Sequence, residues 1–93
     1  MKYELTIITP EETTELGIEQ ITRSVRRFSD SIITIENDGV KRLAYPIHGN
    51  ERGRYLFYVL ELNQGQPQAL YERLNINDNV LRFLLVKSDT RYI

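Results

Sequence analysis

This chain contains few of the residues that enzymes use to make or break covalent bonds. There is no cysteine, which excludes disulfides, thiolate metal sites and cysteine nucleophiles. The single histidine, His48, falls in a predicted loop without a second imidazole, so a histidine metal cluster or catalytic triad is not expected. No Gly-x-Gly-x-x-Gly run or phosphate-loop motif occurs either. The composition therefore predicts no metal, no cofactor and no small-molecule substrate.

A phosphatase-like use of the first loop is the enzymatic alternative. Small enzymes of the acylphosphatase type hold phosphate with backbone donors and an arginine in the loop after the first strand. Here that loop reads Thr9-Pro10-Glu11-Glu12, in which proline donates no hydrogen bond and the glutamates repel phosphate. Glu15 and Glu19 belong to the first helical stretch, where solvation and the helix dipole explain them. We therefore expect a protein that is not an enzyme.

Basic side chains along the chain offer a second chemistry, the binding of nucleic-acid phosphates. The net charge of −1 by itself argues weakly against a free-standing nucleic-acid binder. The acids, however, gather on the first helical stretch, while bases dominate elsewhere. Such local basic spots predict weak RNA binding alone and tighter binding beside a basic partner, with an evenly solvated surface as the alternative. The candidate phosphate contacts are Lys2, Lys41, Arg52, Arg54, Arg82 and Lys87.

Aromatic residues beside two of these bases suit RNA bases or a protein partner. The run Arg-Gly-Arg-Tyr-Leu-Phe-Tyr-Val at 52–59 partly resembles the RNA-recognition-motif signature, but Arg54 stands in an aromatic place and Tyr55 in a small one. If Tyr58 faces the core, Tyr55 and Phe57 lie on the opposite face of the same strand. Base stacking, contact with a protein and ordinary cross-strand packing are all open for these two rings.

Period-two alternation predicts the strands that position these side chains. The first strand places Tyr3, Leu5 and Ile7 on one face. The second is long and bent, with a bulge near Gly39, because a glycine interrupts an alternating run there. In the third, the inward residues are expected at 56, 58, 60 and 62. The strands are expected at 2–9, 31–47, 54–62 and 80–87, with a turn at 48–53.

Two helices are expected between these strands. In the first, which begins at Pro10, apolar residues recur at helical spacing from Ile18 to Phe28. The second, at 67–74, is shorter and buries two leucines. The expected caps are Thr9, with Thr13 as its rival, for the start of the first helix, and a left-handed Asn75 for the end of the second.

The order βαββαβ predicts an α+β, ferredoxin-like fold. It has a four-stranded antiparallel sheet with two helices on one face and the other face open. The strand at 31–47 lies at the sheet edge, where it can pair with another chain. The 93 residues are expected to form a single domain, with a short tail at 90–93. With no apolar run of membrane length and no signal-peptide layout, we expect a cytoplasmic protein that does not enter a membrane.

The segment 39–47, Gly-Val-Lys-Arg-Leu-Ala-Tyr-Pro-Ile, is the most specific in the chain. It places two bases between apolar residues and ends in Tyr-Pro-Ile, an arrangement that core packing does not require. It resembles the Gly-x-basic-x-Leu-Ala-Tyr-x-Ile segment on the second strand of the bacterial small-subunit ribosomal protein number six family. Residues 1–5, 53–58 and 78–88 fit the other strands of that family. His48 departs from it, because Lys, Arg, Asn, Ser or Ala usually follows the isoleucine.

This resemblance implies a structural component of the bacterial small (30S) ribosomal subunit without catalytic activity. Family members bind the central domain of 16S rRNA cooperatively with a small basic protein, ribosomal small-subunit protein number eighteen. Together with the edge position, the resemblance indicates a partner surface formed by Ile35, Arg42, Leu43, Tyr45, Tyr55 and Phe57. The alternative is a ferredoxin-like protein-interaction or regulatory domain that self-associates through its open sheet face and binds no RNA. Salt-sensitive RNA affinity separates the two.

Overall fold

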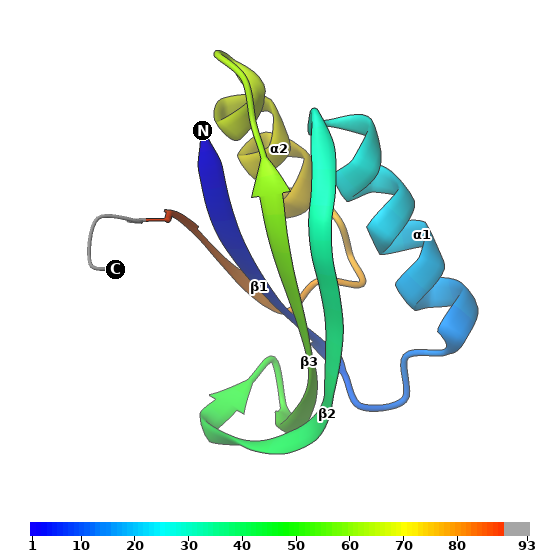
Figure 1. Ribbon diagram of the computed structural model, residues 1–93. Helices are drawn as coiled ribbons and strands as arrows, with labels where there is room; N and C mark the ends of the chain where they lie inside the picture. The colour runs from blue at the N-terminus through cyan, green and yellow to red at the C-terminus, as the bar shows by residue number, and fades with distance from the viewer. Residues whose placement is uncertain (89–93) are drawn as a thin grey trace.

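The alternating runs fold into one antiparallel sheet. The computed structural model describes residues 1–88, and the tail expected at 90–93 lies outside them. The strands lie in the order β2-β3-β1-β4, with every neighbouring pair antiparallel. Figure 1 shows both helices on the same face of this sheet, which confirms the ferredoxin-like βαββαβ fold. The elements are β1 (Lys2–Pro10), α1 (Glu15–Arg27), β2 (Ser31–Ile47), β3 (Asn50–Glu61), α2 (Gln66–Asn75) and β4 (Arg82–Lys87).

The hydrophobic core lies between the sheet and the two helices. Every second side chain of each central strand points into this core, because side chains alternate between the faces of a sheet. The four inward positions predicted for the third strand are all buried, at 1% exposure or less. Full burial of a leucine-sized side chain stabilises the fold by about 1.5–3 kcal/mol. The core comprises Leu5, Ile7, Ile21, Val25, Leu56, Tyr58, Leu60, Leu62, Leu70 and Leu74.

The first helix begins later than predicted. β1 continues to Pro10, and Thr9 is completely buried in that strand, so neither residue is available to start a helix. The N-cap is Thr14, which has extended backbone angles and accepts a hydrogen bond on its side-chain oxygen from the Gly17 N–H at 3.2 Å. The predicted caps Thr9 and Thr13 are therefore both wrong. The helical spacing that identified the element is correct, and Ile21 and Val25 are among its buried residues.

The turn between β2 and β3 is tighter than the predicted loop over 48–53. Only His48 and Gly49 leave the strands, with φ of 49° and 81°, as a two-residue hairpin turn with two positive φ angles requires. β3 therefore starts at Asn50. The side-chain amide of Asn50 donates to the carbonyl of Ile47 at 3.1 Å and to that of His48 at 3.3 Å. These bonds hold the turn closed.

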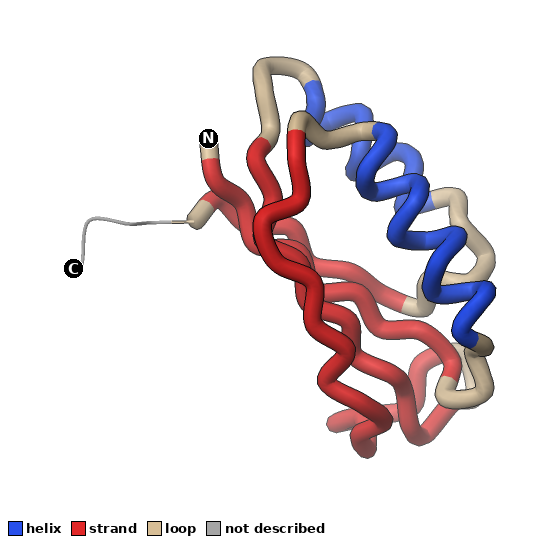
Figure 2. Tube along the Cα trace, turned by 45° about the vertical axis from the view of Figure 1, so that its right-hand side comes forward, coloured by secondary structure: helices blue, strands red, loops and turns tan. Residues whose placement is uncertain are grey.

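β2 is an irregular strand at the sheet edge. Its register against β3 shifts between Ile32 and Thr34, between Asn37 and Gly39, and again beyond Arg42. The bulge predicted near Gly39 is confirmed, because Gly39 has φ 83° and its N–H donates to the side-chain oxygen of Asn37 at 3.0 Å. Figure 2 shows the far part of this hairpin extending beyond the helices.

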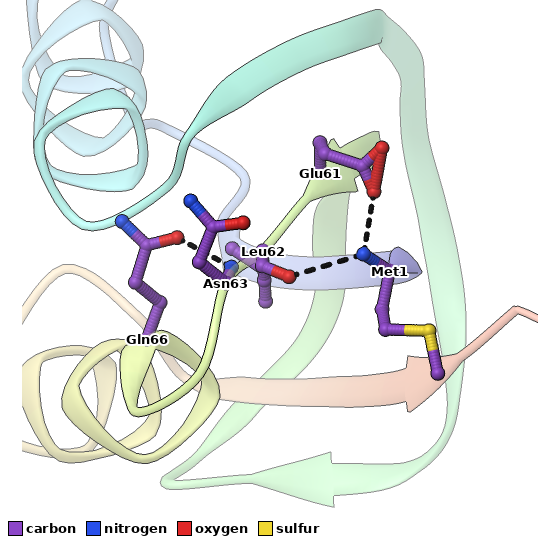
Figure 3. Close-up of polar contacts among 5 residues, drawn as sticks. All are labelled: Met1, Glu61, Leu62, Asn63 and Gln66. Carbon is purple, nitrogen blue, oxygen red and sulfur yellow. Dashed lines mark hydrogen bonds and ion pairs between the residues drawn. The ribbon is translucent and has the colours of Figure 1, made fainter.

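Polar contacts hold the first residue against the end of β3 (Figure 3). The α-amino group of Met1 lies 2.8 Å from a carboxylate oxygen of Glu61 and donates to the carbonyl of Leu62 at 3.3 Å. In the turn that follows, the Asn63 N–H donates to the side chain of Gln66 at 2.7 Å, and the Gln66 N–H donates to the Asn63 carbonyl at 3.0 Å. This exchange supports the start of α2, whose N-cap glycine has no side chain.

The segment from α2 to β4 differs from the prediction at both ends. Asn75 is the last helical residue, and the C-cap, Ile76, has φ −102°, so the expected left-handed Asn75 cap is wrong. β4 starts at Arg82 rather than Val80. The backbone explains this delay, because the Val80 N–H donates to the carbonyl of Asn77 at 3.0 Å and keeps the chain in a turn.

Candidate nucleic-acid interface

The open face of the sheet, away from the helices, carries the side chains that alternate with the core-facing ones in each strand. The central side chains of this open face are half-buried by their neighbours. Those on the outer strand are more accessible, with Leu84 62% and Val86 42% exposed. The face is therefore apolar in its middle and most accessible along β4. Its cross-strand rows are Tyr55–Ile8–Arg82, Phe57–Thr6–Leu84 and Val59–Glu4–Val86.

The predicted phosphate contacts occupy three places. Lys2 and Lys87 lie at the same end of β1 and β4, where the Ser88 N–H donates to the carbonyl of Lys2 at 2.8 Å. Arg82 stands at the opposite end of β4. A single RNA strand would have to cross the sheet to contact both ends of β4. The remaining three lie in the β2–β3 hairpin: Lys41, Arg52 and Arg54.

The hairpin arginines differ in the freedom of their charges. The Nε of Arg52 lies 3.5 Å from a carboxylate oxygen of Glu11, an exposed ion pair of the kind that contributes little to stability. Arg54 alternates with Tyr55, so its side chain leaves the sheet on the side of the helices. Its Nε is buried and has no hydrogen-bond acceptor among residues 1–88. Arg52 is therefore accessible to phosphate, and Arg54 is turned inward.

Lys41 and Tyr55 form a cation–π pair on the open face. The Nζ of Lys41 lies 5.1 Å from the centroid of the Tyr55 ring. At a partly exposed site such a contact is worth about 0.5–1 kcal/mol. The ammonium group occupies the ring face on which a base would stack. The geometry therefore favours Tyr55 as a support for the Lys41 charge over Tyr55 as a stacking platform.

The predicted partner residues divide between the two faces of the sheet. On β2, Ile35 is 47% exposed and Tyr45 is 69% exposed. Ile35 pairs with the buried Tyr58, which places Ile35 on the side of the helices. Tyr55 and Phe57 are half-buried on the open face. A partner that contacts all of them would have to wrap around the β2 edge.

Two other predicted partner residues make contacts inside the hairpin. Leu43 is only 7% exposed. Its Cδ2 lies 3.4 Å from the position that a Cβ on Gly53 would take, and Ile8 Cγ2 lies 2.6 Å from that same position. Leu43 therefore folds over the open face beside Ile8. Arg42 lies 3.8 Å from the Glu51 carboxylate, in an exposed ion pair. Tyr45 is the more accessible apolar residue of this segment.

A hollow on the open face was missed in the sequence. It has a volume of about 300 Å³ and lies between β1 and β4. Its signal was the outward-facing phase of the alternation in these strands, of which only Lys2 and Arg82 were predicted to have a function. The hollow is lined by Thr6, Ile8, Arg82, Phe83 and Leu84.

Within residues 1–88, no three His, Cys, Asp or Glu side chains are grouped so that they could hold a metal ion. No helix in that range has both the length and the apolar character needed to cross a membrane. In the first loop, Glu11 faces Arg52 rather than an open phosphate cradle.

Comparison with known proteins relates this arrangement to one family. The family model for ribosomal protein S6 matches residues 2–87. The small ribosomal subunit protein bS6 of Thermus thermophilus is 31% identical over 96 residues, which cover 99% of this chain and 95% of the relative. That of Chlamydia abortus is 29% identical over 87 residues, 94% of this chain and 78% of the relative.

Solved structures give the same fold. The crystal structure of 30S ribosomal protein S6 from Thermotoga maritima aligns with a TM-score of 0.80 at 21% identity, over 94% of this chain and 86% of that one. An uncharacterized protein from the same organism aligns with a TM-score of 0.61 at 23% identity, over 95% of this chain and 96% of that one. At these identities the likeness shows the fold alone.

Proposed function

This chain belongs to the bacterial ribosomal protein S6 family of the small ribosomal subunit, and we propose that it binds the central domain of 16S rRNA cooperatively with ribosomal small-subunit protein number eighteen. The observation that carries the proposal is the family match, which extends over residues 2–87 and so includes every predicted contact residue. The role is architectural: the protein holds RNA and partner in place in the cytoplasmic ribosome and catalyses no reaction.

The RNA contacts in this proposal are electrostatic. Lys2 and Lys87 form one contact point, Arg82 a second, and the hairpin a third, with Lys41 on its open face and Arg52 on the opposite one. Phosphate contacts of this kind fix the position of a protein on RNA, while the shape of the RNA selects the site. Because the net charge is −1, these separated bases are expected to bind RNA weakly without help. A basic partner beside them supplies the missing positive charge.

The partner contacts in this proposal follow the edge strand. Tyr45 and Ile35 offer exposed apolar surface on β2. Tyr55 and Phe57 extend that surface around the strand onto the open face. Large aromatic residues are enriched among those that dominate protein–protein binding energy. Leu43, being buried, supports this surface from within the hairpin.

A binding titration tests the proposal. The protein is titrated with a central-domain fragment of 16S rRNA, with and without the basic partner, at two salt concentrations. Tight binding only with the partner, weakening as salt rises, is the expected result. Failure to bind in either mixture, with partner and RNA shown to be competent, overturns it. A concentration-independent homodimer under the same conditions would support the self-associating interaction domain instead.

Charge variants assign the contacts. R82Q and K87Q should each weaken RNA binding and lower the salt slope by about one. R23Q is the matched control, because Arg23 is an exposed arginine on α1, away from the sheet. Equal losses in all three variants would mean that net charge, rather than these positions, controls the affinity.

A further inference from the structure

The hollow on the open face results from the size of one side chain in a cross-strand row. In the row Phe57–Thr6–Leu84, the middle residue is a threonine between two large apolar residues. The next row supplies Ile8 and Arg82, and Leu43 folds over the far side of Ile8. The low point at Thr6 is therefore surrounded by larger side chains. Its volume of about 300 Å³ lies at the lower end of the range of small-ligand sites, about 300–1,000 Å³.

One positive charge lines this hollow, and a second lies farther across the open face, over β3. Arg82 lines it directly. Across the Tyr55–Ile8–Arg82 row, Lys41 holds its ammonium group above the Tyr55 ring. Among residues 1–88, the observed ion pairs leave both bases without a carboxylate partner. Glu4 is the acid of the following row in β1, and its carboxylate accepts a hydrogen bond from Ser88 at 3.4 Å.

This combination selects among the possible occupants. An apolar side chain of a protein would fill the hollow but would gain nothing from Arg82. A continuous RNA duplex presents phosphates to the arginine, but its stacked bases cannot enter. An unpaired nucleotide offers both a flat, largely apolar base and an attached phosphate. RNA-binding proteins commonly recognise such splayed bases in loops and bulges.

We infer that the open face holds one unpaired RNA nucleotide, with its base in the hollow over Thr6 and its phosphate on Arg82. The inference rests on the proposed function, and it adds the kind of RNA feature that the protein requires. It also divides the open face, because the base occupies the β1–β4 half and leaves Tyr55 and Phe57 on β3 to the protein partner. RNA and partner can then bind together without competing for one surface.

The test uses the full chain and two RNA hairpins that differ at one position. One hairpin carries a single unpaired 2-aminopurine in a bulge; in the other, the same base is paired. Tighter binding to the bulged hairpin, by about tenfold, is the difference expected for holding one base. Insertion should also change the 2-aminopurine fluorescence of the bulged hairpin only, since the base leaves its stacked environment.

Variants at Thr6 assign the preference to the hollow. T6F fills the low point and should abolish the tenfold preference while leaving binding to the paired hairpin unchanged. T6V is the matched control, because valine has nearly the shape of threonine and keeps the hollow open. Far-UV circular dichroism and thermal melting of both variants establish that they are folded, as expected for a position on the open face.

Each outcome has a distinct meaning. If the native protein binds both hairpins equally and in a salt-dependent way, RNA binding stands and the inference fails. It also fails if T6F and T6V behave alike. If T6F weakens binding of the protein partner and not of RNA, the hollow takes a protein side chain and the inference is overturned. If neither hairpin nor the central-domain fragment binds, even with the partner, the proposed function itself fails.

Discussion

The hydroxyl groups of Thr22 and Tyr58, 36 residues apart in the sequence, lie 2.8 Å from each other and form a hydrogen bond between α1 and β3. Tyr58 is completely buried, so its hydroxyl needs this partner. The bond fixes the position of α1 over the sheet at one point in an otherwise apolar contact. Thr22 thereby gives a polar group a defined position inside the core.

Removing this bond should destabilise the fold moderately. Y58F keeps the ring in the core and deletes the hydroxyl, so we expect a loss of about 1 kcal/mol in the free energy of unfolding. Chemical denaturation measures it. Y55F is the control. The Tyr55 ring lies on the open face, so deleting its hydroxyl should cost less of the free energy of unfolding. Equal losses would mean that the bond contributes nothing specific.

Alkaline pH should weaken the fold through the same residue. Burial raises the pKa of Tyr58 above its ordinary value of 10.0, and the hydrogen bond with Thr22 lowers it in part. The unfolded chain then releases this proton at a lower pH than the folded protein does. The contribution of Tyr58 to the free energy of unfolding is therefore fully present below pH 10 and is lost as the pH rises above it. Denaturation curves of the wild type and Y58F should converge above pH 10; a constant difference would contradict this.

The hairpin offers a matched pair of variants, one buried and one exposed. L43A removes a side chain that is 7% exposed and should cost about 2 kcal/mol of stability. Y45A, at a residue 69% exposed, should change stability by less than about 0.5 kcal/mol. Y45A should nevertheless weaken binding of the protein partner, measured by calorimetry. Normal partner affinity in Y45A would remove this residue from the partner surface.

Gly53 marks a close approach between β1 and the hairpin. An added Cβ would lie 2.6 Å from Ile8 Cγ2 and 3.2 Å from the Thr9 carbonyl oxygen. G53A should therefore destabilise the protein by about 1–3 kcal/mol. A double-mutant cycle with I8A, which removes the clashing methyl group, measures the origin of the loss. If G53A costs the same in both backgrounds, the clash with Ile8 is not the cause.

The cap of α1 can be assigned by a pair of threonine variants. T14A deletes the side-chain oxygen that accepts from the Gly17 N–H and should cost about 1 kcal/mol. T13A removes a hydroxyl that does not cap the helix and should cost less. Thermal unfolding compares them, and a larger loss in T13A would favour Thr13, the rival cap, over Thr14.

The core was predictable because burial follows the period of each element. The spacing from Leu5 to Ile7 and from Ile21 to Val25 needs no knowledge of neighbouring strands, and all four are buried. The helix start was not predictable in this way. Thr9 and Pro10 have the residue types of a helix start, but pairing with β3 retains both in β1. Tertiary pairing overrode a local preference there.

The site depends on relations between strands, which one strand does not reveal. The hollow exists because the register places Thr6 between Phe57 and Leu84, and a shift by one residue would fill it. The burial of Leu43 likewise depends on how the hairpin folds over Ile8. The strand on which each of these residues lies was therefore predictable, but their grouping on the sheet was not.

The central position of β1 in the sheet affects how the protein folds during its synthesis. β1, which is translated before the other strands of this sheet, pairs on one side with residues 53–61 and on the other with residues 82–87. No neighbour in the sheet is available to it until most of the chain has been translated. Contacts so distant along the chain slow folding, and an unpaired apolar strand invites association with other nascent chains. One side of β1 therefore stays unpaired until β4 has been translated.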